Sequence, residues 1–502
     1  MHKTFWLMGV LVLAACGSAT LDGDSGISAD EGGVGFSGEG EGLEGGSISE
    51  VEFDGNNQAV ISFDDVGEDE RYVLALYSYN ASGNTEAYQL GNSKSLNREL
   101  SALTLDRTEK LTEDFHETLR EEESFLNPDE SVKTSQPRAA KLAQSVGDTR
   151  KFKVLNSFGG AGTYETVTAV LIYKGNNFLA WVDKRNQDSY TSDEWNSVLA
   201  TFDSQIASER TMFGTESDVD GDGRFNCLFT QVVNELGGSS GGIVTGFFYA
   251  VDLFTNYKQS NQTEVINAFV ADPSGEFGTA ISKEFAKSNI HPSVLLHEFQ
   301  HMINFNMHYF VNAGSPEMSF LNEALSHQAE DLHSLDGSGY MTATGPENPA
   351  RVAGYLDSID DLCIICGASL YQRGGSYLLI RYLYEQAEKG NLAGASSGAD
   401  LIDRLLDTDK TGVENIVSAV YGEGTSEERF GNLMGQFGLA VFLSDTGLSD
   451  DSRFQIDGIG LRSAQDDNRG TVLDGPAVNS ASGGITSTIG GASLSFVELT
   501  SD

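Results

Sequence analysis

Two different periods of apolar and polar residues follow one another along the chain. From residue 51 to residue 105, runs such as RYVLALYSYN alternate with a period of two and are separated by turn sequences such as NASGN. Alternation of this kind is typical of half-buried strands bounded by turns. The pattern predicts a small all-β domain over residues 51–105.

A second alternating region begins at residue 151 with KFKVLNSF and continues through ETVTAVLIYKGNNFLAWVDK. The sequence GNN at 175–177 predicts a hairpin turn, and the apolar spacing over 192–208 predicts a helix. Residues 228–270 hold further apolar runs, including LFTQVVNEL, that predict strands. One of these strands would flank a cleft and pair with an extended peptide.

The later part of the chain changes to helical spacing. Apolar residues recur every three or four positions in HPSVLLHEFQHMINF at 291–305, and helical patterns continue over 412–447. The final segment, 451–502, is a β-like tail rich in Ser and Gly. Strands, a hairpin and then helices predict an α+β fold for a domain over residues 151–450.

Two segments connect these parts without an evident core of their own. Residues 16–50 consist mainly of Gly, Ser, Asp and Glu, which cannot bury enough apolar surface to fold, so we expect a flexible tether. Residues 106–150 are charged and helix-prone. Their composition leaves open whether they form a linker or a removable pro-segment.

The N-terminus has the order of a bacterial export signal. An apolar run at 5–13, preceded by Lys3, is too short to cross a bilayer as a helix, and the LAAC sequence at its end resembles a lipobox. Residues 1–15 are therefore predicted to be a signal peptide, and Cys16 a lipidated N-terminus. The alternative is an ordinary signal peptide without a lipid. Gly17 favours outer-membrane sorting by the same resemblance, so we expect an envelope lipoprotein of the outer membrane or cell surface.

The charge of the chain narrows its partners. The 502 residues include 31 Lys and Arg against 74 Asp and Glu, which gives a formal net charge of −43. Such an excess of negative charge argues against nucleic acid or an anionic lipid surface as a partner. The lipid at the N-terminus is the only membrane contact that we expect.

The HEFQH sequence at 297–301 is an HExxH motif within the apolar helical pattern. Positions i and i+4 lie on one face of an α-helix, so His297 and His301 can bind the same Zn²⁺. Glu298 lies beside the first His and can act as a general base without binding the metal. A catalytic zinc site also needs a third protein ligand and an open position.

The third ligand must come from elsewhere in the chain. The extended HExxHxxGxxH pattern is excluded, because positions 304 and 307 hold Asn and Met. The NEALS sequence at 322–326 offers Glu323 in a second helical pattern, and the break at 314–316 lets the two helices return antiparallel. The rival ligands are Glu317, His308, Glu330 and Asp331.

HEFQHMINF followed by LNEALSHQAEDL resembles the hyicolysin-type metallopeptidases, a gluzincin branch of the HExxH zinc peptidases. The resemblance covers residues 150–450 and is strongest over 290–385. It implies a gluzincin-like zinc metallopeptidase domain, with a β-sheet, active-site helices and a helical C-terminal part. It also implies one catalytic Zn²⁺ and an endopeptidase that is secreted or bound to the cell surface.

Three further residues are candidates for supporting roles. Tyr371, in YQRG, is similar to the Tyr of the Tyr-x-[Lys/Arg]-Gly segment of gluzincin aminopeptidases, which stabilises the oxyanion. The alternative is an ordinary residue at a helix start. His327 follows Glu323 by one helical turn and is a candidate hydrogen-bond donor, and Asp331 could orient a ligand His.

The DVDGDG sequence at 218–223 places Asp218, Asp220 and Asp222 at alternate positions, as in the first half of a Ca²⁺ loop. Phe229 stands where an EF-hand would have its bidentate Glu. An Asp/Gly turn between strands is therefore the alternative, and any Ca²⁺ bound here would be structural.

The cysteines after Cys16 are expected to have structural roles and no redox function. Cys363 and Cys366 are expected to form a local disulfide, because no thioredoxin-like context surrounds them. Cys227 is expected to be a small buried apolar residue.

Together these features predict a zinc-dependent endopeptidase that cleaves protein or peptide substrates at the bacterial cell envelope. The alternative function is that of a catalytically degenerate surface lipoprotein, acting as an adhesin or binding module. The presence of all four residues needed for zinc chemistry counts against that alternative.

Overall fold

The computed structural model describes most of the chain from residue 144 onward and several shorter segments before it. The described residues are 8–16, 48–51, 70–80, 86–90, 110–126, 144–158, 162–238, 242–334, 341, 343–422, 427–467, 469–481 and 485–499.

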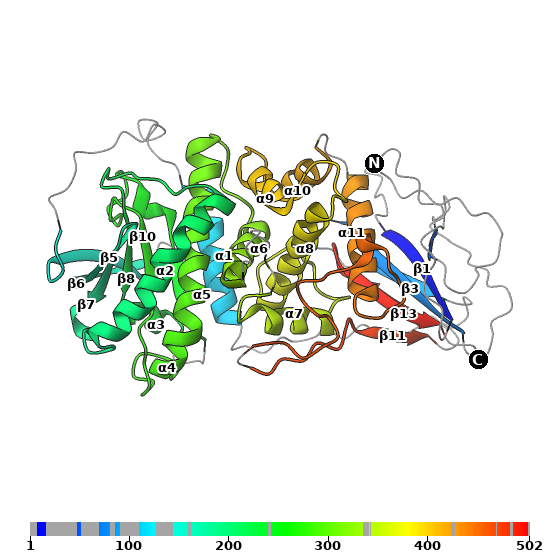
Figure 1. The fold of residues 1–502 in the computed structure, drawn as a ribbon, viewed down its shortest axis with the longest axis horizontal. Helices are drawn as coiled ribbons and strands as arrows, with labels where there is room; N and C mark the ends of the chain where they lie inside the picture. Colours follow the sequence, from blue (N-terminus) through cyan, green and yellow to red (C-terminus); the bar gives the residue numbers. More distant parts are fainter. Residues whose placement is uncertain are drawn as a thin grey trace.

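A six-stranded mixed sheet occupies one end of the molecule (Figure 1). Its strands are β5 (Thr149–Ser157), β6 (Thr163–Lys174), β7 (Phe178–Asp183), β8 (Phe225–Phe229), β9 (Gly246–Phe248) and β10 (Val265–Ala268). They are ordered β5-β6-β7-β8-β10-β9, with β7, β8 and β10 parallel and the other pairs antiparallel. The hairpin predicted at 175–177 joins β6 to β7, and β9 lies at an edge of the sheet.

The interior strands of this sheet are covered by two long helices. Every residue of β7 and β8 is buried. Helix α2 (Ser192–Phe213) confirms the prediction for 192–208, and helix α5 (His291–Phe305) contains the HExxH motif. Phe299 of α5 stacks on Phe225 of β8 with ring centroids 4.6 Å apart, and Phe202 of α2 contacts both rings. This aromatic packing fixes α5 against the sheet.

The strand predictions over 228–270 are confirmed only in part. Strands β9 and β10 form where apolar runs predict them, but the QVVNEL part of LFTQVVNEL is helix α3 (Gln231–Leu236). The Thr230 hydroxyl accepts a hydrogen bond from the Val232 N–H and caps this helix. An N-cap at the end of β8 thus overrides the strand preference of the two valines.

The part of the chain from α5 to Leu443 is mainly helical, as predicted. Its helices after α5 are α6 (Ser319–Glu330), α7 (Asn348–Asp357), α8 (Leu370–Glu388), α9 (Gly398–Leu406), α10 (Gly412–Tyr421) and α11 (Glu427–Leu443). Helix α6 packs between α5 and α8. Short π-helical segments, Ala286–Ile290 and Asn306–Val311, extend α5 at both ends. The mixed α+β architecture is confirmed, and the specific gluzincin layout stays a prediction.

A second sheet joins the two ends of the chain. It contains β1 (Met8–Cys16), β2 (Ile48–Val51), β3 (Glu70–Ser78), β11 (Val478–Ala481) and β13 (Leu494–Leu499), in the order β11-β13-β3-β1-β2. Strand β4 (Glu86–Leu90) pairs with β12 (Ile485–Ile489). Strands predicted for a separate β-domain therefore pair with strands predicted for a tail, although the division into domains stays a prediction.

Strand β1 coincides with the predicted signal peptide, so its pairing describes the uncut chain. A chain cut before Cys16 would lose most of the strand that lies between β2 and β3. Among the described residues, no helix combines the length and apolarity needed to cross a membrane. The expected disulfide joins Cys363 to Cys366, and Cys227 is buried and unpaired in β8.

Candidate metal centre

Helix α5 presents two imidazoles on one face. His297 and His301 are both buried, and their Nε2 atoms lie 3.1 Å apart. Pro292 in the first turn and the apolar residues that pack on the sheet favour a helix here. The spacing of four residues then places one imidazole above the other, as the motif predicts.

Helix α6 brings a carboxylate to the same point. The Oε2 and Oε1 atoms of Glu323 lie 3.4 Å from His297 Nε2 and 3.5 Å from His301 Nε2. Glu323 is fully buried, and neither oxygen makes a hydrogen bond within the described part of the chain. Arg373 Nη1 lies 3.1 Å from Oε2 and offsets part of the cost of burying this charge. A metal ion between the carboxylate and the two imidazoles would offset more of it.

The separations of these donor atoms fit a tetrahedral metal ion. A zinc ion with bonds of about 2.0–2.1 Å holds its ligand atoms about 3.3 Å apart. The three observed separations run from 3.1 to 3.5 Å, with a different oxygen of Glu323 facing each imidazole. His297, His301 and Glu323 therefore fit a zinc site with three protein ligands.

The outward-facing nitrogens of both imidazoles are held by polar partners. His297 Nδ1 lies 2.9 Å from Glu330 Oε1. His301 Nδ1 lies 2.7 Å from Asn322 Oδ1 and 3.0 Å from Ser326 Oγ. Hydrogen bonds from Nδ1–H to these oxygens would leave each Nε2 lone pair facing the metal position.

His297, His327 and Glu330 form a second group that could hold a metal. In it, Glu330 Oε1 lies 2.9 Å from His297 Nδ1 and 2.8 Å from His327 Nδ1. These are hydrogen-bond distances, shorter than the separation of two ligands on one tetrahedral ion. We therefore interpret Glu330 as a hydrogen-bond acceptor that orients both imidazoles.

The charges around the metal-free ligands are strongly coupled. Burial lowers the pKa of His297, but Glu323 and Glu330 outweigh burial and raise it to about 9. Burial raises the pKa of Glu323, but Arg373 and the two ligand imidazoles outweigh burial and hold it well below the usual range. The carboxylate is thus kept ionised, as a metal ligand must be.

Glu298 makes its hydrogen bond to the sheet, whereas His297 and His301 make theirs to α6. Its Oε2 accepts a hydrogen bond of 2.7 Å from the backbone N–H of Phe248, in the edge strand β9. The side chain is almost fully buried, and burial raises its pKa. The structure therefore ties Glu298 to the sheet and leaves metal binding to the three residues described above.

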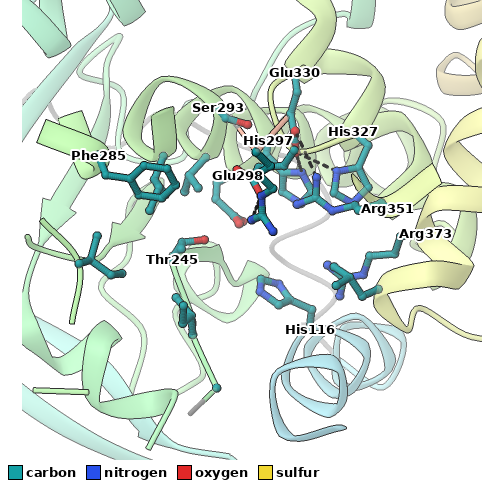
Figure 2. A pocket seen from close by; sticks show the side chains of 18 of the residues that line it. His116, Thr245, Phe285, Ser293, His297, Glu298, His327, Glu330, Arg351 and Arg373 are labelled. Atoms are coloured by element: carbon teal, nitrogen blue, oxygen red, sulfur yellow. Dashed lines mark hydrogen bonds and ion pairs between the residues drawn. The ribbon is translucent and has the colours of Figure 1, made fainter. Parts of the chain in front are cut away.

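Of these groups, His297, Glu298 and Glu330 line a cavity of about 780 Å³ (Figure 2), while His301 and Glu323 are fully buried behind them. Its lining includes His116, His297, Glu298, His327, Arg351 and Arg373. Figure 2 shows His297, Glu298 and His327 on one side of the cavity, with Arg373 and His116 on the other. The cavity therefore gives a substrate access to the predicted base and to one predicted ligand.

Tyr371 does not line this cavity, contrary to its expected role at the oxyanion. Its ring lies against α7, where a Cβ added to Gly354 would approach it within 2.2 Å. Arg373, two residues later on α8, lines the cavity and contacts Glu323 Oε2 at 3.1 Å. Within YQRG, the side chain that lines the cavity is that of Arg373.

Asp331 also lies away from the ligand histidines. Helix α6 ends at Glu330, so Asp331 is turned toward α8, where it accepts hydrogen bonds from Tyr377 (2.8 Å) and Arg381 (2.9 Å). The role expected of Asp331 is filled by Glu330, which contacts His297. The prediction for His327 fits better, because its imidazole lies beside His297 with ring centroids 4.7 Å apart.

The predicted calcium ligands lie together. Asp218, Asp220 and Asp222 each offer an oxygen within 4.8 Å of the others. Asp218 also accepts a hydrogen bond from Gly223 N–H, and Asp222 accepts one from Arg224 N–H, as in an ordinary Asp/Gly turn. Calcium binding therefore stays a prediction.

Comparison with known proteins agrees with this chemistry. The chain is similar to a metalloprotease. The relative is the neutral metalloprotease ShpI of Staphylococcus hyicus, with 28% identity over 228 residues. The match covers 43% of this chain and 48% of ShpI, so it spans about half of that protein's length. No protein-family model matches the chain.

Proposed function

We propose that the protein is a zinc-dependent endopeptidase that hydrolyses peptide bonds of protein or peptide substrates. The convergence of His297, His301 and Glu323 at separations that suit Zn²⁺, with His297 and Glu298 lining one cavity, carries this proposal. The similarity to a neutral metalloprotease supports it independently of the geometry.

The three ligands define where a zinc ion would lie. When bound there, zinc supplies a water of lowered pKa and polarises the carbonyl of the peptide bond. Glu330, Asn322 and Ser326 keep the two imidazoles in orientation, since each accepts or shares a hydrogen bond at Nδ1. This support reduces the reorganisation that metal binding would otherwise require.

Glu298 is the general base in this proposal. The Phe248 N–H holds one carboxylate oxygen, and burial raises the pKa of the group, which favours proton acceptance. As the water oxygen attacks the carbonyl carbon, Glu298 accepts a water proton. Glu298 then gives a proton to the amide nitrogen, the C–N bond breaks, and a carboxylic acid and an amine are released.

One side chain of the cavity suits the developing oxyanion in place of Tyr371. Arg373 lines the cavity, and its guanidinium Nη1 lies 3.1 Å from Glu323 Oε2. His327 could donate from Nε2 only as an imidazolium, because the Nδ1–H of the neutral ring is directed at Glu330 and the buried Nε2 then carries a lone pair. Donors placed in advance at a developing charge can contribute a large part of a rate enhancement.

The edge strand β9 suits an extended peptide. Thr245, which precedes β9, lines the cavity with Glu298. Glu298 and Arg120 already hold the N–H and C=O of Phe248, so a substrate strand could pair with this edge only before Phe248, close to the base. This placement agrees with the prediction that a strand flanks the cleft.

The cellular setting is part of the proposal. A lipid on Cys16 would anchor the enzyme at the bacterial envelope, with the Gly- and acid-rich segment 16–50 as a tether. Any Ca²⁺ at Asp218, Asp220 and Asp222 would be structural. Protein or peptide substrates are the expected partners, and nucleic acid is not.

The test is a cleavage assay on the purified chain with casein or gelatin, with and without a chelator. We expect zinc-dependent cleavage, loss of cleavage on chelation, and recovery when zinc is returned. Glu298→Gln should retain about one zinc per chain and lose cleavage, because the base is not a ligand. A wild-type chain that binds zinc and cleaves neither substrate would instead favour a degenerate binding protein.

A further inference from the structure

The segment predicted as a linker or a pro-segment contains a helix at the metal centre. Helix α1 (Lys110–Ser124) contacts α6 and forms a wall of the cavity. No residue of this segment has a role in the proposed mechanism. The helix nevertheless carries a histidine into the same cavity as Glu298 and His297.

Helix α1 is built into the protein core. Phe115 and Leu119 are fully buried, and the Phe115 ring packs edge-on against Phe247 of β9 and against Phe158, with centroids 5.5 and 5.1 Å apart. Burial of two large apolar side chains stabilises this arrangement by about 3–6 kcal/mol. The helix is thus packed as a core element rather than as a surface linker.

Charged residues of α1 satisfy the backbone next to Glu298. The Arg120 guanidinium donates to the carbonyl oxygen of Phe248, and it forms a buried ion pair of 3.1 Å with Glu123. Glu123 accepts a hydrogen bond of 2.8 Å from the Ala250 N–H. Phe248 is also the residue whose N–H holds Glu298. Helix α1 and the general base are therefore attached to the same short stretch of β9.

His116 lies on the face of α1 that is turned toward the cavity. Its side chain points from α1 into the cavity, across from His297 and Glu298 (Figure 2). The residue is 8% exposed, and its Nδ1 is buried without a hydrogen-bond partner among the described residues. An unsatisfied buried ring nitrogen costs stability, so the position of this histidine at the cavity indicates a role other than packing.

The surroundings of His116 keep its imidazole neutral. Burial holds its pKa well below the usual range, and the positive charge of Arg373 acts in the same direction. A neutral imidazole still has one N–H to donate, and such a group can polarise a substrate carbonyl. A metal ion nearby would further disfavour protonation.

We propose that His116 is a catalytic residue of the peptidase, which donates a hydrogen bond to the substrate at the scissile peptide bond, and that α1 belongs to the active enzyme. This inference rests on the proposed function. Helix α1 forms part of the cleft wall and does not fill the cleft, because a cavity of about 780 Å³ is present with α1 in place. An inhibitory segment that must be removed would fill that space.

The experiment compares full-length His116→Ala and His116→Gln with two control variants. Glu121→Ala alters the exposed face of α1, and His308→Gln alters a buried histidine outside the cavity lining. For each protein we would measure zinc per chain, kcat and KM on a fluorogenic peptide, and affinity for a phosphonamidate transition-state analogue. Mass spectrometry would define the N-terminus of the active wild-type form.

We expect His116→Ala to keep zinc and KM and to lose about 100-fold in kcat and in analogue affinity, as when one oxyanion donor is removed. His116→Gln should recover part of the loss, because its amide can donate. Both controls should retain wild-type kcat. A His116→Ala enzyme with wild-type kcat, or an active form that lacks residues 110–126, would overturn the inference. Absence of zinc or cleavage in the wild type would instead refute the proposed function.

Discussion

Glu330→Gln tests the support that the structure gives to the metal ligands. Glu330 Oε1 faces His297 Nδ1 at 2.9 Å and His327 Nδ1 at 2.8 Å. Glutamine preserves the size of the side chain and one acceptor oxygen, but it removes the negative charge. Charge-assisted hydrogen bonds are about twice as strong as neutral ones. Loss of such an outer partner typically reduces metal affinity about 10–100-fold, which corresponds to about 1.4–2.8 kcal/mol.

The assay is competition for zinc against a chelator of known affinity, together with melting temperatures with and without zinc. The stabilisation that zinc gives should shrink with the affinity. Asp331→Asn is the matched control, because Asp331 pairs with Arg381 in the interior. It should lower the melting temperature of the metal-free protein, since a buried pair is broken, and leave zinc affinity unchanged. Wild-type zinc affinity in Glu330→Gln, or a larger loss in Asp331→Asn, would refute this reasoning.

Three further substitutions test separate parts of the account. Glu323→Ala should lose both zinc and proteolysis, and a variant that retained zinc would remove Glu323 from the ligands. Burial raises the pKa of the Glu317 carboxyl from 4.5 to about 7. The folded chain therefore binds the carboxyl proton more tightly than the unfolded chain does. This difference stabilises the fold at low pH, and the stabilisation is lost as the pH rises toward 7. Glu317→Gln should therefore flatten the fall in melting temperature between about pH 5 and about pH 8, while zinc and cleavage persist; an unchanged profile would contradict the assignment. Cys16→Ser should release the protein from membrane fractions with unchanged peptidase activity, and continued association would point to a protein partner.

Local patterns carried most of what could be predicted about the site. The HExxH spacing places His297 and His301 on one helical face whatever surrounds the helix. The chain break at 314–316 and the second helical pattern then allow an antiparallel return. The structure has this arrangement, because His297 contacts Glu330 near the end of α6 while His301 contacts Asn322 near its start.

The sequence pattern placed Asp331 and Tyr371 less well than the ligands. Their contacts depend on the residue at which a helix ends and on the side of the helix that a residue occupies. The end of α6 at Glu330 turns Asp331 toward Arg381, and helix ends are the least certain feature of a sequence pattern. Within YQRG, the positions of Tyr371 and Arg373 differ by about 200° around α8, so only one of them faces the cavity.

Contacts between distant segments gave no local signal. Strand β3 pairs with β13, and Tyr88 meets Ser495 across 407 residues, which alternation within each segment does not indicate. Helix α1 is similar, because a charged, helix-prone sequence gives no sign that His116 reaches a cavity that α5, α6 and α8 also line. Such long-range pairing depends on packing of the whole chain.

The most direct test of the metal centre is an anomalous difference map at the zinc edge from crystals of the purified chain. The account predicts one strong peak about 2.0–2.2 Å from His297 Nε2, His301 Nε2 and an oxygen of Glu323. A map without a peak there, or with a peak bound by His297, His327 and Glu330 instead, would contradict it.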